Sequence, residues 1–417
     1  MALDCERPVA PPVRLSLSRT DEVAIGRGTE RGFARTLAGL RIDLPDRWTS
    51  QTHARLARTA DGWLVEDAGS KNGTHVNGKR VDTSPLGDGD VLECGGTFLV
   101  LRRAPEATVD FEASADRPES LRTLSPTLER ELGVLPKIAR SRVPVLVLGD
   151  TGTGKEGVAA AIHGLSGRSG PFVAVNCGAI PATLVENELF GSRRGAFSGA
   201  DNRVGLVRGA DRGTLFLDEV AELPLPSQAA LLRMLQEGEV QPLGGDKAIA
   251  VDVRVVAATN RDARRLVADG HLRRDLYARL RGYEVRLPPL RARIEDLGLL
   301  IAAVSARLTR GGAPRTLSRA AARALFAHPF PFNIRELEQI IGAALAVAGD
   351  EIDIDHLAPS LRDPADPSGS DRDRLATLVA QHGGNVSAVA RELGTSRTQV
   401  RRLLRRHAIS SDEIKRR

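Results

Sequence analysis

The segment Val145-Leu-Val-Leu-Gly-Asp-Thr-Gly-Thr-Gly-Lys155-Glu156 decides the fold of the largest part of this chain. Its four apolar residues predict a buried strand, and the glycine-rich turn from Gly149 onward opens a predicted helix. Backbone amides and a helix N-terminus then converge on one point, which suits a phosphate. Lys155 would hold the β- and γ-phosphates of a nucleotide, while Glu156 stands where a Ser or Thr usually ligates Mg²⁺. A glycine-rich turn without a ligand is the alternative.

Two further strand ends supply polar side chains. The run Gly213-Thr-Leu-Phe-Leu-Asp218-Glu219 delivers two carboxylates to the C-terminal end of an apolar strand, where α/β proteins collect their chemistry. We expect Asp218 to fix Mg²⁺ and Glu219 to polarise an attacking water. A third strand ends in Thr259-Asn260, which would sense the γ-phosphate or simply cap the strand. Together with Gly149, Asp150, Thr151, Gly152, Thr153, Gly154, Lys155 and Glu156, these residues predict a site for ATP and Mg²⁺.

The domain organisation follows from length and pattern. A chain of 417 residues exceeds one ordinary core, so two or three domains are expected. Residues 13 to 103 alternate apolar and polar positions between Asn-Gly and Asp-Gly turns, an all-β pattern. Buried-type strands separated by helical stretches then predict a parallel sheet covered on both faces. The predicted order is an all-β domain over 12–104, a linker over 105–120, an α/β subdomain over 121–290, a helical region over 291–362, a linker over 363–370 and a helical tail over 371–417.

Charge and cysteine content narrow the class of protein. The formal net charge is +6, and the stretch from Asp371 to Arg417 alone holds eleven Lys or Arg against five Asp or Glu. A basic excess confined to a short tail indicates contact with nucleic acid, with a solvated helix face as the alternative. The three cysteines are widely spaced and lack CxxC pairs, which favours a reducing compartment. The sequence has neither a long uncharged apolar run nor a signal-like start, so we expect a cytoplasmic protein.

Several motifs occur in the order of a known family: Phe172-Val-Ala-Val-Asn176-Cys177, Glu188-Leu-Phe-Gly191, Gly195-Ala-Phe-Ser-Gly-Ala200, Leu-Phe-Leu-Asp218-Glu219 and Leu287-Pro-Pro-Leu-Arg291. Residues 121 to 362 resemble the AAA+ domain of bacterial sigma-54-dependent transcriptional activators, also called enhancer-binding proteins. The resemblance implies a ring-forming ATPase, most often a hexamer. It implies that Asn176 restrains Glu219, that Arg273 and Arg279 reach the γ-phosphate of a neighbouring subunit, and that Arg335 touches phosphate within its own subunit.

The resemblance also gives a role to the loop between the two halves of the nucleotide site. In the family this loop rises on ATP binding and engages sigma-54. The positions carried over are Gly195, Ala196, Phe197, Ser198, Gly199 and Ala200. Ser198 replaces the commoner Thr and keeps the hydroxyl. Arg193 replaces an acidic residue before the loop, and Phe332 stands where the family usually has Gly.

The all-β segment carries a second constellation. Ile25-Gly-Arg27-Gly28, Ser50-Gln-Thr-His53 and Gly69-Ser-Lys-Asn72-Gly73 resemble the forkhead-associated (FHA) domain. Arg27 and Ser50 suit a phosphate and Asn72 a peptide backbone, so the resemblance implies binding of a phosphothreonine peptide made by a Ser/Thr kinase. His53 is expected to brace the loop, and Gln51 replaces the family's usual Arg.

The basic tail predicts a helix-turn-helix. Gly394 allows a tight turn before Ser396, which would cap the last helix. It resembles the Fis-type DNA-binding domain over residues 371 to 410, and an ordinary helical hairpin is the alternative. The predicted DNA contacts are Arg397, Thr398, Gln399 and Arg402 at base edges, with Arg401, Arg405 and Arg406 near phosphates.

The sequence therefore predicts a sigma-54-dependent activator with an FHA sensor, an AAA+ ATPase and an enhancer-binding tail. Two other functions stay open at this point. One is a phosphopeptide-binding AAA+ regulator that has lost contact with sigma-54, and Ser198 and Arg193 are the residues that favour it. The other is an ATPase regulator of the ordinary polymerase holoenzyme.

Overall fold

The computed structural model describes residues 2–36, 39–103, 110–112, 117–196, 201–309 and 314–362, together with Val379, His382, Val386, Val389 and Leu404. The chain divides into two compact units, Met1–Leu357 and Ala358–Arg417. Among the described residues of the second unit, Val379, Val389 and Leu404 are buried. The predicted DNA-contacting residues lie outside the described ones.

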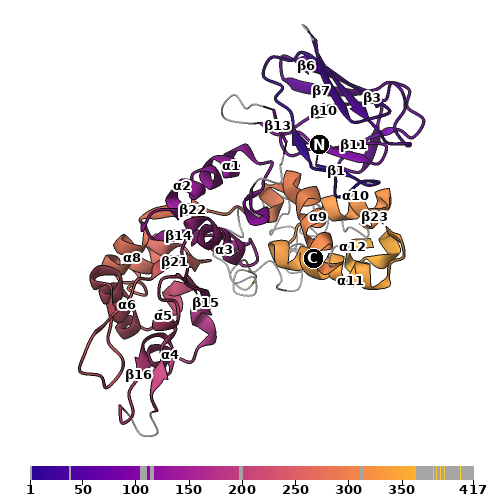
Figure 1. Ribbon diagram of the computed structural model, residues 1–417. Coiled ribbons are helices and arrows are strands. Elements are labelled where there is room, and N and C mark those ends of the chain that lie inside the picture. Colours follow the sequence, from indigo (N-terminus) through magenta and orange to yellow (C-terminus); the bar gives the residue numbers. More distant parts are fainter. Residues whose placement is uncertain are drawn as a thin grey trace. The chain divides into compact units, whose positions relative to one another are not determined.

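The N-terminal part of the first unit is a β-sandwich (Figure 1). One sheet has the order β1-β12-β11-β8-β9 and the other β10-β7-β6-β3-β5-β4. Residues at alternate positions, among them Ile25, Leu56, Val65 and Leu92, fill the space between the sheets. The strands are β1 Leu3–Asp4, β3 Glu22–Arg27, β4 Gly32–Arg35, β5 Gly39–Leu44, β6 Ala54–Thr59, β7 Gly62–Asp67, β8 Thr74–Val76, β9 Lys79–Val81, β10 Thr83–Leu86, β11 Val91–Cys94 and β12 Thr97–Val100.

Two short strands lie outside the predicted β-domain pattern. β1 precedes residue 12, yet it pairs antiparallel with β12 through Leu3 and Phe98. The strand β13 (Phe111–Glu112) falls in the predicted linker and pairs with β2 (Val13–Arg14). Both are only two residues long, too short to show a periodicity in sequence.

The α/β subdomain has a five-stranded parallel sheet of order β15-β18-β21-β14-β22. Apolar runs form its central strands because both faces are covered by helices. The strands are β14 Val145–Leu148, β15 Phe172–Asn176, β18 Thr214–Asp218, β21 Arg254–Thr259 and β22 Tyr283–Arg286. The helices are α1 Pro126–Gly133, α2 Leu135–Ala139, α3 Lys155–Ser166, α4 Val185–Phe190, α5 Leu206–Gly209, α6 Leu225–Glu237, α7 Ala263–Ala268 and α8 Arg274–Leu280.

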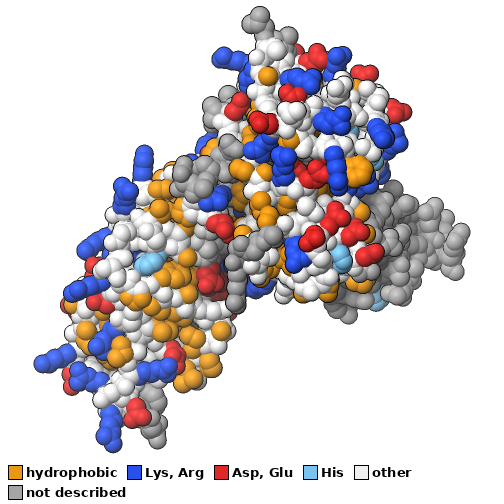
Figure 2. Space-filling view, turned by 45° about the vertical axis from the view of Figure 1, so that its right-hand side comes forward, with side chains coloured by type: hydrophobic (Ala, Val, Ile, Leu, Met, Phe, Trp, Pro, Cys, Tyr) orange, Lys and Arg blue, Asp and Glu red, His pale blue; other side chains and the backbone are white. Residues whose placement is uncertain are grey.

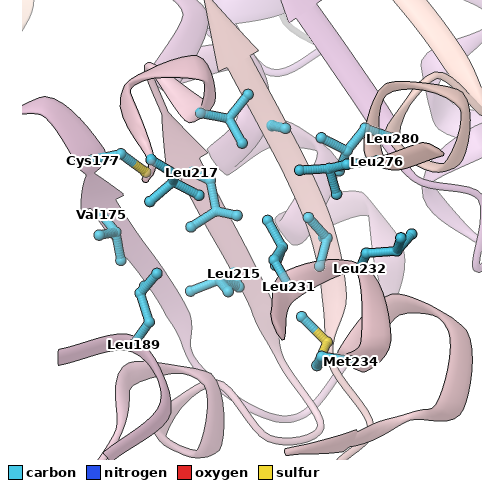
Figure 3. Packing of buried hydrophobic residues seen from close by; sticks show 14 of the residues in the cluster. Val175, Cys177, Leu189, Leu215, Leu217, Leu231, Leu232, Met234, Leu276 and Leu280 are labelled. Carbon is cyan, nitrogen blue, oxygen red and sulfur yellow. The ribbon is translucent and has the colours of Figure 1, made fainter. Parts of the chain in front are cut away.

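One face of this sheet packs on α6 and α8 (Figure 3). One buried cluster contains Leu215 and Leu217 of β18, Leu231 of α6 and Leu276 of α8, and all four are at most 1% exposed. Leu128, Ile162 and Phe216 belong to a second cluster that involves α1 and α3. This close packing fixes the strand ends that carry the site.

Short elements complete the α/β subdomain. They are η1 Glu119–Leu121, η2 Cys177–Ala179, η3 Val220–Glu222, β16 Gly191–Ser192, β17 Arg203–Val204, β19 Glu239–Val240 and β20 Ile249–Ala250. The pair β16 and β17 forms the antiparallel base of the loop that carries Gly195 and Ala196.

A helical lid follows the sheet. The segment Leu290–Asp296, with η4 Leu290–Ala292 and η5 Ile294–Asp296, joins the sheet to the lid. The lid elements are α9 Leu297–Leu308, β23 Thr316–Leu317, α10 Arg319–Ala327, α11 Asn333–Val347, β24 Glu351–Ile352, η6 Ile354–His356 and α12 Pro359–Arg362. Ser318 caps α10 by accepting a hydrogen bond from the amide of Ala321. None of the helices in the described part of the chain combines the length and apolar character that a bilayer crossing requires.

Candidate functional site

The phosphate loop joins β14, which lies between β21 and β22 in the sheet, to α3. Gly154 stands at the N-cap of α3 with φ of 100°, a left-handed conformation that glycine adopts without steric cost. Lys155 is 6% exposed, and its ammonium group donates to the carbonyls of Gly149 at 3.0 Å and Asp150 at 3.4 Å. The buried ammonium therefore lies within the loop and ready to meet a phosphate.

The lid holds the other side of the phosphate loop. Asn333 is fully buried, its side chain donates to the carbonyl of Thr151 at 2.9 Å, and its amide oxygen accepts from the backbone of Leu290 at 2.8 Å. The backbone amide of Ile334 donates to the carbonyl of Gly152 at 2.9 Å. Lid and phosphate loop are thus coupled through hydrogen bonds to two adjacent loop residues, Thr151 and Gly152.

This packing explains the unusual residue at position 332. The carbonyl of Phe332 lies where a Cβ on Gly152 would collide with it, so the contact is made by backbone. The Phe332 side chain is 63% exposed and its φ is −104°, which any residue adopts. A side chain is therefore tolerated there in place of the family's Gly.

Asp218 and Glu219 end β18 at the carboxyl edge of the sheet. Glu219 has φ of 52°, an uncommon value for a residue with a side chain. Its carboxylate accepts from the backbone amide of Asn260 at 3.1 Å and lies 3.8 Å from the ammonium of Lys155. Burial raises the pKa of Glu219 in spite of these two partners. The geometry brings a base candidate to the phosphate loop.

The neighbouring strands end at the same edge. Asn176 ends β15 directly beside Asp218 in the parallel register. Its amide oxygen accepts from the backbone of Gly178 at 3.0 Å, whereas the partners of Glu219 are Asn260 and Lys155. Asn260 also donates to the hydroxyl of Thr151 at 3.2 Å, and the buried Thr259 accepts from the backbone of Arg261. The ends of β15, β18 and β21 thus lie on one side of β14, at the same sheet edge as the phosphate loop.

The three candidate arginines occupy different places. Arg273 precedes α8 and forms a bidentate ion pair with Asp275, with a shortest distance of 2.7 Å. Arg279 donates to the carbonyl of Leu235 at 2.9 Å. Arg335 lies on the first turn of α11, beside Gly152 of the phosphate loop. The partners of Arg273 and Arg279, which are Asp275 and Leu235, do not belong to the phosphate loop of this chain.

Sequence reasoning missed a buried charge network behind the phosphate loop. Arg293 donates to the carbonyl of Thr153 at 2.8 Å and lies 3.8 Å from Asp296. Asp296 is 1% exposed and accepts from the hydroxyl of Thr123 and the backbone of Leu124. Burial raises the pKa of Asp296 and lowers that of Arg293. The close spacing of charges in Arg291-Ala-Arg293-Ile-Glu-Asp296 was the available signal.

The predicted phosphopeptide-binding residues lie together at one end of the β-sandwich. Gly26 is required because the carbonyl of Gln51 occupies the place of a Cβ, so the loop that carries Ser50 lies against β3 beside Arg27. The Ser50 hydroxyl accepts from the backbone of Lys71 at 3.0 Å, and the Asn72 side chain donates to the carbonyl of Trp48 at 2.7 Å. His53 is fully buried and accepts from the backbone of Ser50, so it braces the loop.

Two sets of predicted residues lie partly or wholly outside the described ones. Gly195, at φ of 88°, and Ala196 are described, whereas Phe197, Ser198, Gly199 and Ala200 are not. The residues of the tail that lie outside the described ones are Arg397, Thr398, Gln399, Arg401, Arg402, Arg405 and Arg406.

Four family models match consecutive parts of the chain. The FHA domain matches residues 23–95, the Sigma-54 interaction domain 121–286, the AAA+ ATPase lid domain 291–374 and the Bacterial regulatory protein, Fis family, 371–407. The fold and the site define a multidomain AAA+ protein with a P-loop nucleotide site and an FHA sandwich, and the Fis-family match adds a helix-turn-helix.

Individual proteins of known sequence are similar to this chain. The chain is 38% identical over 310 residues to the transcriptional regulatory protein GlrR of Escherichia coli K12, over 71% of this chain and 70% of that protein. It is 40% identical to the acetoin catabolism regulatory protein of Cupriavidus necator, over 72% of this chain and 49% of that protein. The chain thus spans about half the length of several curated relatives.

A solved structure gives the same picture. NtrX from Brucella abortus in complex with ADP is similar with a TM-score of 0.53 and 30% identity, over 68% of this chain and 69% of that one. NtrX has also been solved with ATP. The chain belongs to the family of sigma-54-dependent transcriptional activators.

Proposed function

We propose that this protein hydrolyses ATP in a ring of its own copies and uses the energy to remodel RNA polymerase held closed by sigma-54. The observation that carries the proposal is the convergence of Lys155, Asp218 and Glu219 at one sheet edge. The matching Sigma-54 interaction domain and the family membership support the partner.

The chemistry follows from the residues at this edge. The loop amides and Lys155 would bind the phosphates, and Glu219 would orient and polarise the attacking water. The site also fits Mg²⁺, which takes one or two carboxylates together with phosphate oxygens, and Asp218 is the carboxylate in place. A bound Mg²⁺ would neutralise charge on the phosphates.

Arg273 and Arg279 complete the site in trans under this proposal. An arginine that reaches the γ-phosphate of the next protomer stabilises charge as the bond breaks. Asn176 would hold Glu219 back until nucleotide and partner are both engaged, and Thr259 and Asn260 would report the γ-phosphate. Arg335 would add a contact from the lid of the same subunit.

The loop Gly195–Ala200 transmits the work to the polymerase in this account. Replacement of Phe197 by Ala is expected to preserve ATP hydrolysis, because Phe197 is not among the proposed nucleotide-binding residues, and to abolish formation of open promoter complexes. Transcription from a sigma-54 promoter and ATP turnover are measured on the same protein. A Val347→Ala variant, which trims a 67% exposed apolar side chain at the end of α11, is the control and should transcribe normally. Normal transcription by the Phe197→Ala variant would refute the role of the loop.

The FHA domain is the proposed sensory input. Arg27 ends β3, and Ser50 and Asn72 lie on loops at the same end of the sandwich, so the three offer a cation, a hydroxyl and an amide to a phosphothreonine peptide. An Arg27→Ala variant is expected to weaken binding of such a peptide at least tenfold, because a charge-assisted bond to phosphate is lost. Calorimetry with phosphorylated and unphosphorylated peptides measures this loss. Arg55→Ala, which breaks an exposed ion pair with Glu22, is the matched control.

The tail completes the proposal as the DNA-binding part. Basic and acidic side chains are interspersed on the face drawn in Figure 2, whereas the last 47 residues carry a net charge of +6. The match to the Fis family supports binding of enhancer DNA through Arg397, Thr398, Gln399, Arg401, Arg402 and Arg405. A hexameric ring, a Ser/Thr kinase that supplies the peptide and a cytoplasmic location belong to the same proposal.

A further inference from the structure

The outer face of one FHA sheet carries side chains that a lone sandwich does not bury. Leu3, Phe98, Glu93 and His75 stand side by side across β1, β12, β11 and β8. Their neighbours Leu92 and Val76 point into the sandwich core. Phe98 is 1% exposed and Glu93 is 2% exposed, although this face points away from that core. A carboxylate is rarely buried so deeply without a charged partner, so another element must cover this face.

The covering element is the lid helix α10. Arg323 forms a bidentate ion pair with Glu93 at 2.5 and 2.7 Å. The ring of Phe326 stacks on Phe98 with 5.0 Å between centroids and 9° between planes. A charged pair flanked by an aromatic stack is the composition of a specific interface rather than of a chance contact.

The N-terminal strand adds a second contact with the lid. The carbonyl of Ala2 packs against Gly298 of α9 so closely that a Cβ there would collide with it. The backbone amide of Leu317 donates to the carbonyl of Cys5 at 3.0 Å. Backbone of the sandwich and backbone of the lid therefore meet directly, which only a glycine at position 298 permits.

The FHA domain also contacts the α/β subdomain and the segment that joins it to the lid. Arg14 forms an ion pair with Glu129 of α1 at 2.7 Å and donates to the carbonyl of Leu124. Arg102 contacts the segment that joins sheet and lid, with bonds to Glu295 at 2.7 Å and to the carbonyl of Ala292 at 3.1 Å. The FHA domain thus spans the α/β subdomain, the joining segment Leu290–Asp296 and the lid.

This span reaches the nucleotide site through residues already described. The joining segment holds the phosphate loop through Arg293 and Thr153, and the lid holds it through Asn333 and Thr151. A change in the angle between lid and sheet must alter these contacts. Lid movements of this kind set the turnover of many enzymes.

We propose that the FHA domain acts as a clamp that fixes the lid against the α/β subdomain and thereby slows ATP turnover. The proposal rests on the ATPase function proposed above and adds the regulation of that site. The surface that does this is the outer face of the β1-β12-β11-β8 strands, and its partner is the lid of the same chain.

The proposed phosphopeptide-binding end of the FHA domain also contacts the lid. Trp48 lends its carbonyl to the Asn72 side chain, while its ring lies under the guanidinium of Arg319 from the lid, 4.9 Å from the ring centre. A phosphopeptide that binds Asn72 therefore contacts a residue whose own partner, Trp48, touches the lid. Peptide binding is the natural signal for release of the clamp.

Gly298→Ala is the test variant because it changes no charge and lies outside the nucleotide site. Alanine is a better helix former than glycine, so α9 should tolerate it, while the new Cβ pushes the N-terminal strand away. Gly342→Ala in α11 is the matched control, because its Cβ would meet only Leu308 at an ordinary 3.5 Å. Hydrogen exchange of β1 and α10 reports docking, and phosphate release reports turnover.

The clamp predicts faster exchange at β1 and α10 and about a fivefold or greater rise in turnover for Gly298→Ala, with no change for Gly342→Ala. Arg323→Glu should act in the same way, and Glu93→Arg in the same protein should restore slow turnover. Increased exchange with unchanged or reduced turnover would overturn the clamp, as would unchanged exchange in both disrupting variants. If wild type and variants all fail to hydrolyse ATP, the ATPase proposal fails, and the exchange data still decide whether the domains are docked.

Discussion

Replacing Glu219 by Gln is expected to lower ATP hydrolysis by a factor of about 10² to 10⁴ and to leave ATP binding intact. The amide keeps the shape of the side chain and can still accept from the backbone of Asn260, but it cannot serve as a base. Phosphate release measures the first effect, and binding of a fluorescent ATP analogue measures the second.

The control for this variant is Glu222→Gln. Glu222 lies three residues away, is exposed and pairs with Arg261 at 3.0 Å, so its loss should change turnover little. Because burial raises the pKa of Glu219, the wild-type rate should fall on the acid side at a pH above that expected for an ordinary glutamate. Comparable hydrolysis by the Glu219→Gln and wild-type proteins would remove Glu219 from its role as base.

Arg273→Ala is expected to reduce turnover by about 10³ when every subunit carries it, because a charge that stabilises the transferred phosphoryl group is lost. Arg265→Ala removes another exposed arginine, one paired with Asp269, and should retain activity. Measurement of both over a range of protein concentrations separates a loss of catalysis from a loss of assembly.

Mixing of subunits tests whether Arg273 acts on its neighbour. A Lys155→Ala subunit cannot bind phosphate properly but still offers its own Arg273 to the next protomer. An equal mixture of Lys155→Ala and Arg273→Ala subunits should regain about a quarter of wild-type turnover, because that share of the sites pairs an intact loop with an intact arginine. A mixture as inactive as its two components would show that the arginine acts within its own subunit.

Much of the fold could be predicted from the sequence because its signals are local. The apolar run Val145–Leu148 and the glycines after it specify a strand, a turn and a helix start through neighbouring residues alone. The all-β character of the N-terminal domain was predicted from alternation and Asn-Gly turns in the same way, whereas its sandwich fold followed from the resemblance to the FHA domain. The strand ends at Asp218 and Asn260 meet at the phosphate loop because parallel strands share a carboxyl edge.

What escaped prediction depends on contacts between residues far apart in the chain. Glu93 and Phe98 look like ordinary sheet positions until Arg323 and Phe326, more than two hundred residues later, cover them. In the sequence, Arg293 is one of several charged residues after the Leu287-Pro-Pro-Leu-Arg291 motif. Its partner in the structure is the backbone carbonyl of Thr153 in the phosphate loop. Local sequence patterns do not predict such pairs, because the two partners lie far apart in the chain.

The partner loop and the DNA-binding tail remain predictions from sequence and family. Phe197 and the arginines after Ser396 lie outside the described residues, so the family match is their support. Phe197 is the deciding residue, because ATP hydrolysis alone does not distinguish a sigma-54 activator from an AAA+ regulator that has lost its contact with sigma-54.

The most direct test is binding of purified sigma-54 to the assembled protein with a nucleotide analogue that mimics the transition state of ATP hydrolysis. The account predicts a stable complex with the analogue, little binding with ADP, and loss of the complex in the Phe197→Ala variant. Rings that hydrolyse ATP but fail to retain sigma-54 with the analogue would contradict it.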